Sequence, residues 1–166
     1  VIDSNGEKVF PIMFQQIGLF IPNGLTAVMR YNKWGYANQS VKLKINYKYQ
    51  YAGDFEFGLA KVKIKEKFGI INSDGKFVIP AEYSEIEGFE QNLLRVKKGG
   101  FYGLINRNNE VVLSVKYEKI EEITETLILL QSNEKLAYYN LNDNSFVFVE
   151  AGFNLQPEVE EVTTEE

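Results

Sequence analysis

The chain has 166 residues, 45% of them hydrophobic and 14% aromatic, and a formal net charge of −5, which suits one ordinary β-rich domain and argues against a nucleic-acid partner. It contains no cysteine and no histidine, so disulfides and thiolate metal sites are excluded and the commonest general base is missing. The longest aliphatic run, residues 127–130, is far too short for insertion into a membrane.

One sequence unit recurs along the chain with a spacing of 34 residues. A partial earlier copy at the start keeps a spacing of 35 residues as far as Phe20. Because a fixed period of this size means that each unit packs on its neighbours, the spacing predicts a repeat architecture and argues against one embedded active site. The clearest recurring positions are Trp34-Gly35, Phe68-Gly69, Tyr102-Gly103 and Leu136-Ala137, then Asn38, Asn72, Asn106 and Asn140, then Tyr49, Tyr83 and Tyr117.

The clearest copy, residues 59–90, predicts a series of short strands. Residues 60–65 alternate between apolar residues and lysine, which predicts a strand with one buried face. A second strand is expected over residues 68–72, and the hairpin turn at 72–75 supplies residues that tolerate positive φ. A third strand over 76–79 is expected to end at Pro80, with a fourth over 83–86. Gly69 and its equivalents are expected at a bulge, a positive φ or a close backbone approach.

The predicted fold is therefore all-β, with tandem antiparallel hairpin or meander repeats that form an open stack or a propeller-like array. The repeat domain is expected over residues 1–152, with a partial repeat at 1–33, repeats at 34–67, 68–101 and 102–135, and a degenerate capping repeat at 136–152. Residues 153–166, with five glutamates and no basic residue after residue 156, are expected to be an acidic linker or a disordered tail. An open array leaves an exposed edge, through which copies of the chain can associate.

These units resemble the WG-containing repeat family. The unit of that family is a basic residue, an aromatic residue and glycine, followed by a glycine turn and a Val-Ile-Pro segment. The resemblance covers about residues 1–149. It implies a bacterial protein of a family that generally lacks a defined activity. It also favours a surface-associated or secreted location over the cytoplasm. It rests on Lys67-Phe68-Gly69-Ile70-Ile71-Asn72-Ser73-Asp74-Gly75-Lys76-Phe77-Val78-Ile79-Pro80 and on Lys33-Trp34-Gly35-Tyr36.

Tyr47 and Tyr51 are the candidate ligand-binding residues. If residues 47–51 are extended, they place three tyrosines on one face, which could stack on sugar rings or on a peptide. The alternative is that Tyr49 belongs to the repeat core and its neighbours merely flank it.

Two charged patterns are interpreted as solvent-facing surfaces. Lysines at 61, 63, 65 and 67 could meet an acidic surface, although a strand face of lysines also blocks edge aggregation. Glutamates recur at 82, 85, 87 and 90 and at 118, 121, 122 and 125. A glycosidase needs two carboxylates across a cleft. Glutamates that recur at equivalent positions of successive repeats are instead typical of solvated loops. Residues 3–6 and 72–75 faintly resemble calcium loops but lack the ligand spacing.

The sequence favours a non-enzymatic module for protein–protein binding or scaffolding. The alternative is a carbohydrate-binding module that uses exposed aromatic residues, and a third reading is a hydrolase with paired carboxylates. The expected partner is a protein or a polysaccharide, with no nucleic acid, no cofactor and no metal.

Overall fold

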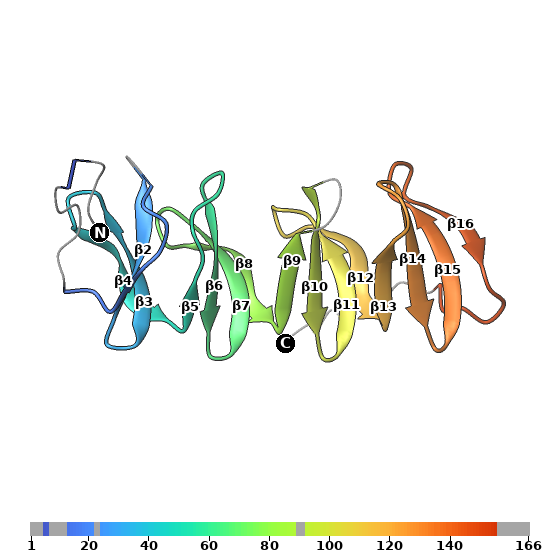
Figure 1. The fold of residues 1–166 in the computed structure, drawn as a ribbon. Helices are drawn as coiled ribbons and strands as arrows, with labels where there is room; N and C mark the ends of the chain where they lie inside the picture. Colours follow the sequence, from blue (N-terminus) through green and yellow to red (C-terminus); the bar gives the residue numbers. More distant parts are fainter. Residues whose placement is uncertain (1–4, 7–12, 22–23, 89–91, 156–166) are drawn as a thin grey trace, which may run out of the picture. The chain divides into compact units, whose positions relative to one another are not determined.

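The fold consists of β-strands arranged in four successive antiparallel sheets (Figure 1). The structure is a computed structural model that describes residues 5–6, 13–21, 24–88 and 92–155. Within those ranges sixteen strands form four sheets of four, and each sheet is a meander of strands consecutive in the chain. The predicted all-β fold of tandem antiparallel repeats is confirmed, while the choice between an open stack and a propeller stays a prediction.

The strands divide into two compact units. Unit 1, Val1–Ser84, holds sheets I and II, and unit 2, Glu85–Glu166, holds sheets III and IV. Sheet I contains β1 (Gln16–Ile17), β2 (Leu25–Arg30), β3 (Lys33–Asn38) and β4 (Leu43–Tyr49), and sheet II contains β5 (Tyr51–Ala52), β6 (Leu59–Ile64), β7 (Lys67–Asn72) and β8 (Phe77–Tyr83). Sheet III contains β9 (Glu85–Gly88), β10 (Leu94–Lys98), β11 (Phe101–Ile105) and β12 (Val111–Tyr117), and sheet IV contains β13 (Lys119–Glu122), β14 (Leu127–Ser132), β15 (Lys135–Asn140) and β16 (Ser145–Val149).

The sheets are out of phase with the repeat boundaries drawn from the sequence. The expected fourth strand at 83–86 does not exist as one element, because Tyr83 ends β8 whereas β9 pairs with β10 of the next sheet. The expected end at Pro80 is also wrong, since β8 continues through it to Tyr83. Pro80 is tolerated because β8 is the outer strand of sheet II and pairs only with β7.

Each unit buries a core between its two sheets. In unit 1 the hydroxyl of Tyr36 donates a hydrogen bond to the carbonyl of Gly53 at 2.7 Å, and its ring meets Phe55 edge-on with centroids 4.8 Å apart. This contact joins a strand of sheet I to the chain that follows β5 of sheet II. The buried residues of this core are Ala27, Tyr36, Ile45, Tyr49, Ala52, Ala60, Val62 and Ile71.

The core of unit 2 extends past the expected end of the repeat domain. Phe153 is 7% exposed and stacks on Tyr117, with ring centroids 6.2 Å apart. The chain turns back after β16 at Gly152, whose φ is +88°, and this turn carries Phe153 into the core. The core of unit 2 thus includes Phe153 from the segment expected to be a tail, and residues 156–166 of that segment lie outside the described residues.

Repeated turn chemistry closes the hairpins. The side-chain oxygen of Asn72 accepts hydrogen bonds from the backbone N–H groups of Asp74 and Lys76, which is an Asx turn. Asn106 makes the equivalent pair. The central hairpin of each sheet instead turns on two residues with positive φ, as in a type I′ turn. These pairs are Tyr31-Asn32, Lys65-Glu66, Gly99-Gly100 and Asn133-Glu134.

Candidate functional site

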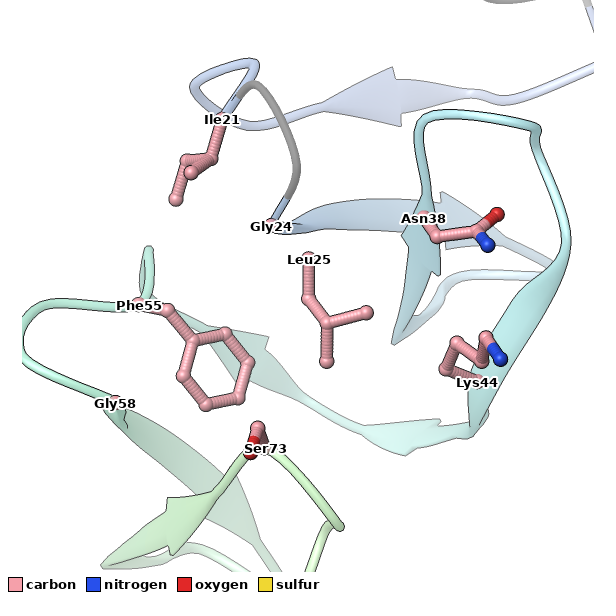
Figure 2. A pocket seen from close by; sticks show the side chains of 8 residues that line it. All are labelled: Ile21, Gly24, Leu25, Asn38, Lys44, Phe55, Gly58 and Ser73. Atoms are coloured by element: carbon pink, nitrogen blue, oxygen red, sulfur yellow. The ribbon is translucent and has the colours of Figure 1, made fainter.

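A pocket of about 470 Å³ opens in unit 1, at the ends of the strands of sheets I and II (Figure 2). Leu25 begins β2 and Phe55 lies in the loop between β5 and β6, and both side chains border the same space. Ile21 completes the apolar part of the wall. The surface of the pocket is thus mostly apolar, which is typical of sites that accept an apolar group.

Polar groups stand at the border of this apolar wall. Asn38 ends β3, Lys44 lies in β4, and Ser73 lies in the turn between β7 and β8. The side-chain oxygen of Asn38 accepts a hydrogen bond from the backbone N–H of Lys42 at 3.0 Å, and this bond fixes the amide at the strand end. Lys44 is exposed and brings a positive charge to the pocket. The site therefore combines an apolar wall with one cation, which matches a ligand group that is apolar and carries a nearby negative charge.

Phe57 is the most unusual residue near this pocket. Its side chain is 96% exposed, and its φ is +50°. It forms a two-residue turn with Gly58, which lines the pocket and has a φ of +80°. Glu56 and Leu59 exchange two backbone hydrogen bonds across this turn, at 2.9 and 3.0 Å. The left-handed conformation costs roughly 1–2 kcal/mol for a residue with a side chain, and an exposed phenylalanine recovers none of this cost by burial.

The sequence carries a signal for Phe57 in the comparison of its repeats. At the corresponding places the other copies have Asn23, Gln91 and Glu125, which are polar residues suited to an exposed turn. Phe57 is therefore the one apolar residue at this position of the repeat. Folding alone does not explain an apolar residue at an exposed turn.

Tyr47 and Tyr51, the candidates from the sequence, do not form a shared platform. Tyr47 is half-buried against the cluster of Val28 and Ala37, whereas Tyr49 is fully buried in the core between sheets I and II. The expectation of three tyrosines on one face is wrong, because β4 ends at Tyr49 and the pairing of β3 with β4 is interrupted by bulges. A ligand-binding role for the two residues stays a prediction.

Tyr51 has a separate environment in sheet II. It lies in β5, is 43% exposed, and meets the ring of Phe68 edge-on at 6.0 Å. The ammonium groups of Lys61 and Lys63 lie 5.5 and 5.4 Å from the centroid of the same Phe68 ring. The expected row of four lysines is broken after Lys63, because Lys65 belongs to the hairpin turn rather than to the strand.

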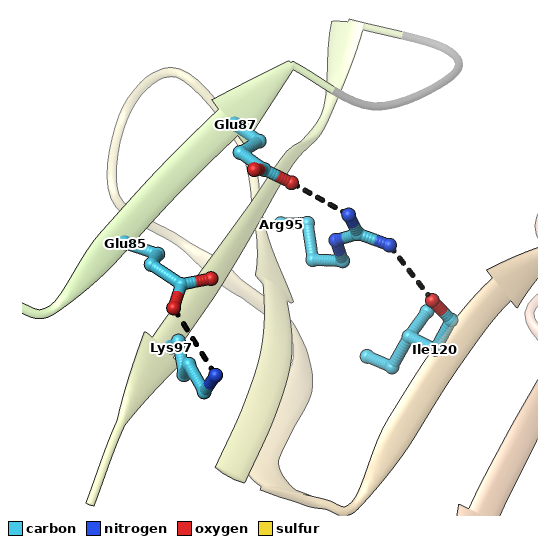
Figure 3. A network of polar contacts seen from close by, with 5 residues as sticks. All are labelled: Glu85, Glu87, Arg95, Lys97 and Ile120. Atoms are coloured by element: carbon cyan, nitrogen blue, oxygen red, sulfur yellow. Dashed lines mark hydrogen bonds and ion pairs between the residues drawn. The ribbon is translucent and has the colours of Figure 1, made fainter. Parts of the chain in front are cut away.

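Among the recurrent glutamates, Glu85, Glu87 and Glu121 form ion pairs and Glu118 accepts a hydrogen bond, whereas Glu90 lies outside the described residues. Glu87 binds Arg95, whose other nitrogen donates to the carbonyl of Ile120 at 3.0 Å, while Glu85 lies 3.1 Å from the ammonium of Lys97 (Figure 3). The network joins sheet III to β13 of sheet IV. These glutamates therefore support the packing of unit 2.

Two other carboxyl groups also have lysine partners. The hydrogen bond from Lys63 lowers the pKa of Glu66, and the hydrogen bond from Lys135 lowers the pKa of Glu150. A general acid needs a raised pKa, so these two groups are unsuited to that role.

Neither suspected calcium loop gains support as a metal site. Turn hydrogen bonds to Asn72 account for residues 72–75, and residues 3 and 4 of the other loop lie outside the described residues. Over the described ranges, acidic residues do not cluster in a way that could hold a metal ion. In the same ranges no helix is long and apolar enough to cross a membrane.

Comparison with known proteins identifies the repeat. The family model described as "WG containing repeat" matches the chain four times, over residues 1–34, 34–68, 68–100 and 102–135. No curated protein matches the sequence significantly.

Proposed function

Because the chain belongs to the WG-containing repeat family, we propose that it is a non-enzymatic repeat module that binds a protein partner, and that unit 1 contacts this partner through the pocket and Phe57. The observation that carries the proposal is the 96% exposure of Phe57 in a left-handed turn beside an apolar pocket. Aromatic residues that stand exposed next to an apolar hollow are typical anchors of protein interfaces.

The chemistry of the pocket defines the partner segment. An aliphatic or aromatic side chain of the partner would lie between Leu25 and Phe55, in the apolar part of the wall. A carboxylate one or two residues away would lie near the ammonium of Lys44. Phe57 would then cover the inserted side chain from the rim, which would bury its own ring and offset the cost of its backbone conformation.

Selection from a random peptide library tests this proposal. We expect enrichment of peptides that combine a large apolar residue with Asp or Glu, and binding should be lost in Phe57→Ala. Lys44→Glu should shift the selection towards Lys and Arg. Tyr31→Ala is the matched control, because Tyr31 is also an aromatic residue of unit 1 in a left-handed turn, 74% exposed with φ +55°. Equal loss in both alanine variants, or no enrichment, would refute the proposal.

Carbohydrate recognition is the second candidate, and the exposed ring of Tyr51 favours it. This ring stands on β5 with one edge against Phe68 and is accessible for stacking on a sugar. Tyr51→Ala should then abolish retention on a glycan array while thermal stability changes little. Retention that is unaffected by this substitution would remove the candidate.

A further inference from the structure

The last strand of the chain differs from its equivalents in the other three sheets. β4, β8 and β12 each bury two side chains, at Ile45 and Tyr49, Ile79 and Tyr83, and Leu113 and Tyr117. Leu113 of β12 pairs with Leu104, and its equivalent in β16 is Phe148, which pairs with Tyr138 and is 52% exposed against 6% for Leu113. Four of the five residues of β16 are exposed. The strand completes sheet IV with Phe146 against Tyr139 and Phe153, yet Val147 and Phe148 remain more than half exposed.

The last strands of the other three sheets carry residues that discourage pairing with a foreign strand. β4 contains Lys44 and Lys48, β8 contains Pro80 and Glu82, and β12 contains Lys116. Charged residues and proline on an edge strand are the usual protection against edge-to-edge pairing. The sequence of β16, Ser-Phe-Val-Phe-Val, contains neither. Within the described part of the chain, β16 pairs only with β15, so its outer edge is open.

An apolar row on one face of sheet IV leads up to this edge. Leu129 of β14 pairs with Tyr138 of β15, and Tyr138 pairs with Phe148 of β16, whose ring lies 6.1 Å away. Tyr138 occupies the repeat position of Tyr36 and Leu104, both of which are fully buried by the sheet that follows them. After sheet IV the chain instead turns back and places Phe153 in the core of unit 2.

We propose that β16 is a self-association site, where the same strand of a second copy of this chain pairs antiparallel with it. An antiparallel edge pairs with itself about a two-fold axis, so one sequence supplies both sides. The two sheets IV then form one continuous sheet, and the row of Leu129, Tyr138 and Phe148 continues into the same row of the partner copy. A five-residue edge is short for a stable interface, so the dimer forms as protein concentration rises.

Sedimentation velocity of the full chain over a series of concentrations tests the site. We expect a monomer–dimer equilibrium that Val147→Lys/Phe148→Lys abolishes. The matched control is Phe77→Lys/Val111→Lys, which places the same charges on the outer strands β8 and β12. The exposed fractions are similar: 43% for Phe77 against 52% for Phe148, and 65% for Val111 against 62% for Val147. The control should dimerise like the unmodified chain. A monomer at every concentration, or equal behaviour of the two variants, would overturn the proposal.

Hydrogen exchange keeps the proposal testable if the charged variant does not fold. The amides of residues 145–149 in the unmodified chain should become more protected at high protein concentration, while those of β12 should not change. Protection that is independent of concentration at β16 would show that the strand does not pair with a second copy, even if dimers form elsewhere. Concentration-dependent protection confined to another strand would overturn the assignment in the same way.

Discussion

The carbonyl oxygen of Ile79 lies 2.7 Å from the place where a Cβ atom would stand on Gly69. A β-bulge between Phe68 and Ile70 brings β7 and β8 this close. The same relationship recurs at Gly35, where the Cβ would meet the carbonyl of Ile45 at 2.5 Å, and at Gly103. Of the three explanations that the sequence allowed for this glycine, the bulge and the close backbone approach are confirmed, and Gly69 has no left-handed φ.

Gly69→Ala should therefore destabilise the protein by about 1–3 kcal/mol, because the obstacle is backbone and cannot rotate away. Gly88→Ala is the control, since nothing lies within 4 Å of its Cβ position, and its effect should stay within about 0.5 kcal/mol. Urea denaturation followed by circular dichroism measures both. The single tryptophan, Trp34, lies in unit 1, so its fluorescence shows whether the loss occurs there. Equal effects of the two substitutions would contradict the steric explanation.

The hydroxyl groups of two core tyrosines should have opposite effects when removed. The hydroxyl of Tyr36 donates to the carbonyl of Gly53, so Tyr36→Phe should destabilise by about 1–2 kcal/mol. The hydroxyl of Tyr49 is buried and finds no partner among the described residues. Tyr49→Phe should thus be neutral or stabilising by up to about 1 kcal/mol. Thermal unfolding of the two variants in one buffer checks the order, and a larger loss for Tyr49→Phe would reverse the interpretation.

The central hairpin turns predict one stabilising and one destabilising substitution in unit 2. Asn133 and Glu134 have φ of +51° and +60°, and Asn-Gly is the preferred pair for such a turn. Glu134→Gly should therefore stabilise by about 1 kcal/mol. Gly100→Glu places a side chain at φ +92° in the equivalent turn of sheet III and should destabilise by at least about 1 kcal/mol. Denaturation midpoints measure both, and a shift of the same sign in both would contradict the turn assignment.

Stability should fall at alkaline pH because of buried tyrosines. Burial, followed by the nearby Tyr139, raises the pKa of Tyr117 from 10.0 to about 12. The unfolded chain releases this proton near pH 10 and the folded chain only near pH 12, so the contribution of Tyr117 is complete below pH 10 and is lost as pH rises to about 12.

Unfolding midpoints measured across this pH range, with and without Tyr117→Phe, check that prediction. The variant should lose less stability than the unmodified chain between the two pKa values, and absorbance titration should show one late-titrating tyrosine fewer. Parallel pH profiles of the two proteins would show that Tyr117 does not titrate in this range.

The sequence predicted the kinds of elements better than their grouping into sheets. Alternation at residues 60–64 and the turn at 72–75 are local signals, and both strand and turn are confirmed. The spacing of 34 residues defines the length of a repeat but not where a sheet begins. That boundary is a single residue between two strands, as at Gln50 and Glu118. A break of one residue does not visibly interrupt the alternation of apolar and polar residues in the sequence.

The candidate site was less predictable than the fold because it depends on contacts between loops. Leu25, Phe55 and Ser73 are far apart in sequence and meet only after sheets I and II have packed. Tyr47 and Tyr51 looked like one surface because they are two positions from Tyr49 on either side, yet a break between sheets separates Tyr51 from the others. Composition alone cannot reveal such a break.

The single-residue junctions between sheets also bear on how such a chain can change its length. A segment of one period contains the strands of one complete sheet wherever it is cut, because consecutive sheets join without a linker. An in-frame duplication or deletion of one period within the array therefore preserves the strand pairing on both sides of the breakpoint, whichever residue it begins with. Recombination between neighbouring copies in the gene would then yield folded proteins with more or fewer sheets and need not fall at a particular codon.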